Sequence, residues 1–187
     1  MRITKLLILL FIVCFTFTFS QEAFTEQYSL VVSMNGSITT NKVGTLYNNR
    51  GAVIEEIYLS ANGNVFVRNN IFAGLAVDYI EISGGRWSNS ETFIGPNVGY
   101  ALNVMEGALY PYVNVSVKLV NYSYGELAFQ KGPAYCIGAG TIITIKEHLG
   151  LNFEIGYRSI QLKDKLATDY TSGDEIRVSI GLSGLIF

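Results

Sequence analysis

The sequence has little of what catalytic and metal sites are usually built from. It holds one histidine, His148, and two cysteines, Cys14 and Cys136, of which only Cys136 lies outside the apolar N-terminal segment. One free cysteine cannot form an internal disulfide, and one Cys with one His cannot form a zinc site. Ser–His catalysis would depend on His148 alone, and that residue falls in a predicted tight turn, where contact with solvent is its expected role. We therefore expect no enzymatic activity, no metal and no cofactor.

Charge is also scarce, and its balance is slightly negative. Asp, Glu, Lys and Arg make up 15% of the chain, against about 25% in an average soluble domain. The formal net charge is −2, and loss of Arg2 and Lys5 with an N-terminal leader would take it to −4. This balance leaves no basic surface of the kind that binds nucleic acid.

Long apolar runs are absent after Phe19. Before that point Arg2 and Lys5 precede the apolar run Leu6–Phe19, and Thr18 and Ser20 offer small residues at the cleavage subsites. This pattern predicts a secretory signal peptide that is too short to span a membrane. We expect cleavage after Ser20, with residues 1–20 as signal peptide and residues 21–187 as one domain. Because lipid requires every backbone amide to be paired internally, an apolar exported chain without a spanning helix is expected to form a closed β-barrel.

Alternation with a period of two predicts the strands of such a barrel. The eight expected strands are Tyr28–Ile38, Val53–Ser60, Ile71–Ile82, Phe93–Val104, Tyr112–Asn121, Ala134–Ile145, Leu149–Ser159 and Glu175–Phe187. The fold class is therefore all-β: an eight-stranded antiparallel transmembrane β-barrel that follows a cleaved signal peptide. The segment Val53–Ser60 alternates poorly, because Glu55 and Glu56 are adjacent, and Pro96 predicts a bulge, since proline has no amide hydrogen for a ladder.

The connections are expected to differ between the two ends of the barrel. The predicted long loops are Thr39–Ala52, Gly84–Ser90, Ser123–Gly132 and Lys163–Gly173. The predicted turns are Ala61–Asn70, Glu106–Leu109 and Lys146–His148. Long loops at one end and short turns at the other are typical of outer-membrane barrels, whose turns face the periplasm.

Charged residues on the predicted strands share one face. They are Asp78, Lys118, Glu154, Arg158, Glu175 and Arg177. We expect this face to line a narrow lumen filled by its own side chains, in which the charges pair with one another, because an unpaired buried charge is costly. Alternatively, Arg158 and Glu175 lie near the rims of the barrel, where water surrounds their charges. The other face is apolar and carries no charge along its centre, which suits lipid, where a charge costs about 2–4 kcal/mol at the midplane.

Aromatic residues are expected at both borders of the apolar face. Tyr79 and Tyr157 lie eight residues beyond Ile71 and Leu149, the first residues after two predicted periplasmic turns, a span close to the height of the apolar band. We assign them to an outer aromatic girdle, and Tyr28 and Phe187 to an inner one.

The final strand changes phase near its end. Val178, Ile180 and Leu182 share one face, whereas Leu185 and Phe187 belong to the other face in a regular strand. This pattern predicts a β-bulge at Gly184 that would bring both sets to the lipid.

With these features the chain resembles the small outer-membrane β-barrel family, OmpA/OmpX-like, in the porin-like form of Bacteroidota. The likeness is carried by a leader that ends in FSQ, the segments NNIFAGLAVDY, FIGPNVGYAL and LGLNFEIGYRSI, and the terminal Phe187. It implies a location in the cell outer membrane, with Phe187 as assembly signal, and no shared catalytic residues. Expected partners are outer-membrane lipid and lipopolysaccharide, periplasmic chaperones and the barrel-assembly machinery, with the protein itself a monomer.

The functional class stays open between two alternatives. The first is a structural or surface-interaction barrel whose lumen is plugged by side chains and whose loops meet lipopolysaccharide or partners. The second is a narrow transport barrel for small or apolar solutes. A secreted lipocalin-like ligand binder is a further alternative, but its exterior should be much denser in charge.

Overall fold

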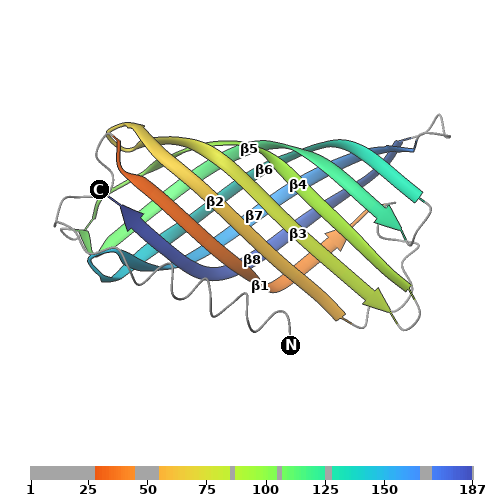
Figure 1. Cartoon of the computed structure of the whole chain (residues 1–187), viewed down its shortest axis with the longest axis horizontal. Coiled ribbons are helices and arrows are strands. Elements are labelled where there is room, and N and C mark those ends of the chain that lie inside the picture. Colours follow the sequence, from red (N-terminus) through yellow and green to blue (C-terminus); the bar gives the residue numbers. More distant parts are fainter. Residues whose placement is uncertain are drawn as a thin grey trace.

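The computed structural model describes residues 28–44, 55–84, 87–104, 107–124, 128–164 and 170–186. Over these residues eight strands form one closed antiparallel barrel, in which each strand pairs with the next and β8 returns to β1 (Figure 1). The strands are β1 (Leu30–Val43), β2 (Glu55–Arg68), β3 (Ile71–Gly84), β4 (Trp87–Ala101), β5 (Leu109–Tyr124), β6 (Ala128–Lys146), β7 (Leu149–Asp164) and β8 (Tyr170–Ile186). The expected all-β, eight-stranded antiparallel fold is confirmed. The expected signal peptide and Phe187 lie outside the described residues.

The described part of the chain holds no helix with the length and apolar character needed to cross a membrane.

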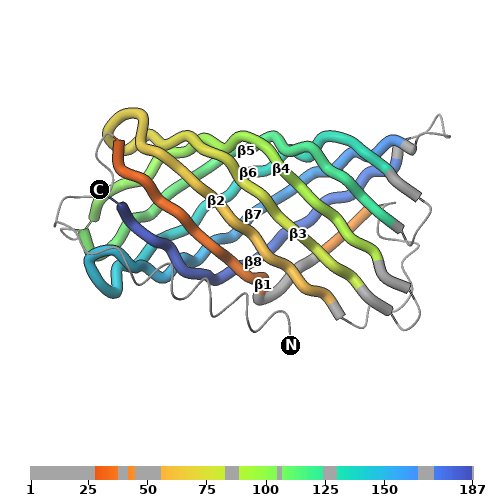
Figure 2. The backbone as a smooth tube through the Cα atoms, viewed as in Figure 1, coloured from red at the N-terminus to blue at the C-terminus, as the bar shows by residue number. Residues whose placement is uncertain are grey.

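The strands are tilted relative to the long axis of the barrel (Figure 2). Passing from Leu30 to its partner on β2, and on from strand to strand, the register returns to β1 at Asn41. Leu30 and Asn41 are eleven residues apart along β1, and one of these residues belongs to the bulge between Ser37 and Thr39. The register offset around the barrel is therefore ten residues. Over eight strands such an offset gives a tilt of about 40°, within the usual range for closed barrels.

The strands extend well into the segments predicted as loops and turns. Much of the predicted turn Ala61–Asn70 belongs to β2, and only Asn69 and Asn70 turn the chain there, with Asn70 at a φ of 72°. At the other end β3 and β4 extend to Gly84 and Trp87, and β5 and β6 to Tyr124 and Ala128. The first and last loops are likewise shortened, because β1 runs to Val43 and β8 begins at Tyr170. The predicted bounds of the loops are therefore wrong, and only the connection between β1 and β2, residues 44–54, keeps a length of eleven residues.

Apolar side chains change sides along the barrel, and this explains the error. In the middle belt they point outward. Toward the outer end they point into the lumen, so the alternation continues there with its polarity reversed, whereas at the inner end apolar side chains lie on both faces. The inner cluster, at the end where β1 begins and β8 ends, consists of Val31, Phe66, Phe72, Ala101, Tyr110, Tyr112, Ile142 and Leu185. The outer cluster, at the opposite end, consists of Ile80, Ile82, Phe93, Val120, Tyr122, Ala134, Ile160 and Leu162.

Gly184 lies in a regular ladder. It pairs with Val32 on one side and with Leu149 on the other, in unbroken register, and Leu185 is 1% exposed within the inner cluster. The predicted bulge at Gly184 is therefore wrong: Leu185 points into the lumen, as Ser183 does, because the lumen is also lined by apolar side chains at this end.

Pro96 also leaves the register intact. It pairs with Leu75 of β3, and the pairs on either side, Ile94 with Leu119 and Asn97 with Ser116, keep the same offset to β5. The predicted bulge at Pro96 is wrong, and the missing amide hydrogen costs only a local gap in the β4–β5 ladder.

The ladder between β1 and β2 is incomplete. It runs from Leu30 to Gly36 of β1, whereas the pairing of β1 with β8 continues to Val43. Beyond Gly36, the described parts of the two strands are joined by side chains: Lys42 Nζ lies 2.7 Å from Glu56 Oε2. We call this stretch the β1–β2 seam.

Candidate functional site

A layer of charge lies inside the barrel, between the inner and outer clusters. It is supplied by β3, β5, β7 and β8, whose lumen-facing positions alternate with the outward apolar ones. Its members are Asp78, Lys118, Arg158, Glu175 and Arg177, each with at most 8% of its surface exposed. The structure thus brings together five of the six charges expected in the lumen.

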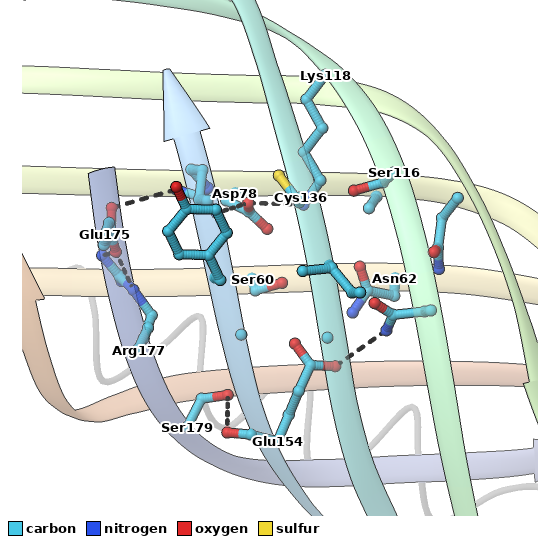
Figure 3. A pocket seen from close by; sticks show the side chains of 18 of the residues that line it. Ser60, Asn62, Asp78, Ser116, Lys118, Cys136, Glu154, Glu175, Arg177 and Ser179 are labelled. Atoms are coloured by element: carbon cyan, nitrogen blue, oxygen red, sulfur yellow. Dashed lines mark hydrogen bonds and ion pairs between the residues drawn. The ribbon is translucent and has the colours of Figure 1, made fainter. Parts of the chain in front are cut away.

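The five side chains form a chain of alternating charge. Figure 3 labels four of them, Asp78, Lys118, Glu175 and Arg177. Lys118 Nζ lies 2.7 Å from Asp78 Oδ2, and Arg158 pairs with the same oxygen. The other guanidinium nitrogen of Arg158 lies 3.8 Å from Glu175 Oε2, and Glu175 pairs in turn with Arg177. Each carboxylate therefore faces two cations, which offsets the cost of burying these charges.

Aromatic rings cover the two guanidinium groups. Arg158 Cζ lies 3.9 Å from the centroid of Phe93, and Arg177 Cζ lies 3.6 Å from that of Tyr58. These are cation–π distances, and they bring the charges into contact with the outer cluster, to which Phe93 belongs and against which Tyr58 packs.

Two charged residues that were not predicted for the site extend it to the seam. Glu56 Oε1 lies 3.4 Å from Arg177 Nη2, and Lys42 binds the other oxygen of Glu56. A signal was present in the sequence, because Glu56, Tyr58 and Ser60 alternate on the lumenal face of β2. The adjacent Glu55 hid that alternation.

Glu154 lies apart from the other five charges. Its Oε2 accepts hydrogen bonds from Tyr112 Oη at 2.7 Å and from Asn114 Nδ2 at 3.2 Å. Within the described residues no Lys or Arg nitrogen lies within ion-pair distance of it. It belongs to a polar layer nearer the inner cluster, in which Asn152 Nδ2 donates to Asn35 Oδ1 at 3.0 Å.

Little space is left between these side chains. Two small cavities of about 50 and 30 Å³ share the walls formed by Asn62, Asn97, Asn114 and Glu154. Each has room for a few water molecules. Glycines make the dense filling feasible: a Cβ built on Gly138 would lie 2.6 Å from Asn114 Oδ1, so the asparagine occupies the room that a side chain would need.

Other reactive residues form no site of their own. Cys136 is a free thiol that lines the larger cavity, and His148 Nδ1 lies 3.0 Å from the carbonyl oxygen of Leu185 in the β6–β7 turn. A search of the described residues gives no group of three or more His, Cys, Asp and Glu side chains that could hold a metal.

The tyrosines assigned to the girdle lie on the outer wall. Tyr79 and Tyr157 are 37% and 43% exposed, and their hydroxyls lie 3.3 Å from Glu81 Oε2 and 3.0 Å from Asp174 Oδ1. Tyr28 is 79% exposed and lies two residues before the start of β1. Their role in a girdle stays a prediction.

Comparison with known proteins gives a match of architecture. No family model matches the sequence, and no curated protein matches it either. Among solved structures the crystal structure of Neisserial surface protein A (NspA) superposes with a TM-score of 0.61 at 14% identity, covering 84% of this chain and 96% of that one. The chain has the fold of small outer-membrane barrels.

Two further structures agree. The crystal structure of the outer membrane protein OprG from Pseudomonas aeruginosa gives a TM-score of 0.58 at 11% identity, covering 86% of this chain and 97% of that one. The solid-state NMR structure of outer membrane protein AlkL in DMPC lipid bilayers gives a TM-score of 0.56 at 21% identity, covering 91% of this chain and 95% of that one. At these identities the likeness is one of fold.

Proposed function

We propose that the chain is a small integral outer-membrane β-barrel with a structural or surface-interaction role, OmpA/OmpX-like in the porin-like form of Bacteroidota. The observation that carries this proposal is the layering of the lumen. A paired charged layer and a polar layer are enclosed between two buried apolar clusters, with cavities of only about 50 and 30 Å³ between the side chains. The plugged lumen favours a structural role over transport of solutes.

The outer wall supports placement in a membrane. Its middle belt exposes large apolar side chains, including Leu75 at 61%, Val113 at 56%, Leu119 at 68%, Ile137 at 56% and Ile155 at 55%. A continuous apolar surface of this kind suits contact with lipid. It is the inverse of a lipocalin-like cup, whose apolar face points inward, so the lipocalin alternative is not supported.

The remaining expectations belong to the same proposal. The protein acts as a monomer without enzymatic activity. Its partners are outer-membrane lipid and lipopolysaccharide, and periplasmic chaperones and the barrel-assembly machinery deliver and insert it.

Two measurements test this proposal. Outer-membrane fractions run on a gel without heating should show a faster band than heated samples, because a folded barrel resists detergent. The purified barrel in planar bilayers should pass no steady ion current. A single band position would count against a membrane barrel, and a steady current would show that the lumen conducts.

A further inference from the structure

A hollow of about 680 Å³ lies on the outer wall of the barrel, within the apolar belt. Its walls are mainly outward-facing apolar side chains of β3 to β8, from Ile71 at one end to Tyr157 and Ile176 at the other. A hollow with apolar walls does not hold ordered water. Because the belt of this transmembrane barrel faces lipid, the occupant of the hollow comes from the membrane.

One register row crosses the hollow and gives its direction. The row consists of the consecutive partners Ile71, Tyr100, Val113, Ala139 and Ile155. Ala139 has the smallest side chain of the five, so it forms the floor. Neighbouring strands lie about 4.8 Å apart, so the row is about 19 Å long. Because the strands tilt by about 40°, the row climbs about 12 Å from the inner end of the barrel. This rise is about half of an apolar band of about 25 Å, which is the depth of one leaflet.

The shape of the hollow favours an acyl chain over a second copy of the barrel. A twofold interface would bring the same hollow of two copies face to face, and the void between them would lose packing contacts. A flexible acyl chain can fill a hollow that is about as long as one leaflet is deep. The hollow is also continuous with the belt that already faces lipid.

A cation lies beside the inner end of the hollow. Arg68 of β2 is the cross-strand partner of Ile71, so the two residues share a face of the sheet, and Arg68 is exposed. Within the part of the chain that the structure describes, Arg68 forms no ion pair. A guanidinium group can donate two parallel hydrogen bonds to a phosphate, and a long side chain at the border of the belt can reach the lipid head groups.

The hollow and the cation together point to one class of lipid. If the barrel has the proposed outer-membrane placement, on which this inference rests, its inner end faces the periplasm, where the leaflet consists of phospholipid. We propose that the barrel binds one phospholipid of this leaflet, with an acyl chain in the hollow over Ala139 and the phosphate at Arg68. Lipopolysaccharide, in the opposite leaflet, would hold its phosphates at the other end of the barrel.

The test is binding of dipalmitoylphosphatidylglycerol to the detergent-folded barrel, counted by native mass spectrometry. The wild-type barrel should bind a first lipid more tightly than the lipids that follow. Ala139→Leu should abolish this first step, because the larger side chain fills the floor of the hollow. Ala61→Leu is the matched control, since it makes the same change at an exposed position of β2 that does not line the hollow, and it should bind as the wild type does.

The phosphate contact is tested separately. Arg68→Gln should weaken the first step about fivefold, the loss expected for one cation near an anionic lipid surface. Lys146→Gln removes an exposed cation elsewhere at the inner end and should leave the first step unchanged. Dipalmitoylglycerol has the same chains without a phosphate, so it should bind equally to the wild-type barrel and to Arg68→Gln.

Other outcomes would overturn the inference. Equal affinity for every successive lipid would show that the hollow is no site, and an unchanged first step in Ala139→Leu would place the lipid elsewhere. An equal loss in Arg68→Gln and Lys146→Gln would show that binding follows overall charge. Tighter first binding of purified lipopolysaccharide than of the phospholipid would assign the hollow to the opposite leaflet. Because every variant is first checked for the unheated gel shift, failure of the lipid site is distinct from failure of the barrel itself.

Discussion

Asp78→Asn should destabilise the barrel more than any change of charge on its outer wall. The Asp78 side chain is 1% exposed, and its Oδ2 is shared by Lys118 and Arg158. Asparagine keeps the shape and one acceptor but removes the negative charge, so two cations stay buried with less compensation. Removing one partner of a buried ion pair typically costs about 3–5 kcal/mol. We expect a loss near the lower limit, since the amide oxygen still accepts a hydrogen bond.

The assay is reversible urea unfolding of the barrel in lipid vesicles, followed by the unheated gel shift. Glu81→Gln is the matched control, because it makes the same change of charge on the outer wall, beside the hydroxyl of Tyr79. Exposed charges contribute about 0–1 kcal/mol, so the control should stay within that range.

A second variant separates charge from packing. Lys118→Met on the Asp78→Asn background removes one of the two cations left with weaker compensation, and should recover part of the lost stability. The reasoning would be refuted if Asp78→Asn cost no more than Glu81→Gln. It would also be refuted if the double variant were less stable than Asp78→Asn alone, because packing and not charge would then decide the stability of this layer.

Three further predictions concern the filling of the lumen. Gly138→Ala should lower stability by about 1–3 kcal/mol, since its Cβ would lie 2.6 Å from an asparagine oxygen. Gly63→Ala should be tolerated, because its Cβ meets nothing within 4 Å. The midpoints of urea unfolding measure the stability of both variants. Leu185→Ala should lower the free energy of unfolding by about 2–5 kcal/mol, because Leu185 is 1% exposed in the lumen. Leu119→Ala should lower it far less, because Leu119 is 68% exposed on the outer wall. A similar loss of stability in both variants would show that Leu185 lies on the outer wall. Cys136 should react with a water-soluble maleimide only after unfolding, as read by mass spectrometry, and rapid labelling of the folded barrel would show an open lumen.

In the middle belt of the barrel, whose outer wall is apolar, the sequence alone was sufficient to predict the strands and their faces. In the middle belt, Leu151, Phe153 and Ile155 point outward and Asn152 and Glu154 inward, so the alternation gives both strand and face. That one rule defines strand number, pairing order and the lumenal position of the charges.

The same rule failed at both ends, because apolar side chains also fill the lumen there. Above the belt water lies outside, so Ile160 and Leu162 turn inward while Gln161 and Lys163 face out. A strand prediction that relies on outward apolar residues therefore stops at this border, although the strand itself continues. Leu185 is the counterpart at the other end, and its change of face was mistaken for a bulge.

Partners within the site depend on distances that alternation does not contain. The shared face placed Glu154 with the cations, yet it lies in a different layer from Asp78, and its partners are Tyr112 and Asn114. Glu56 was not predicted as a lumenal charge, although it occupies a lumen-facing position of the alternation on β2. Strand number and face follow from a local pattern, but the layer that a charge joins follows from the register of all eight strands.

The pairing of β1 has a consequence for the order of folding. Most of its outer half is held by β8, the last strand to be made, and lacks a ladder to its neighbour β2. A typical hairpin gains its hydrogen bonds from residues nearby in the chain, whereas β1 gains many of them across nearly the full chain length, which makes closure a step of high contact order. The outer half of β1 should therefore be the last segment to gain protection from hydrogen exchange during refolding, because its backbone pairing depends on β8.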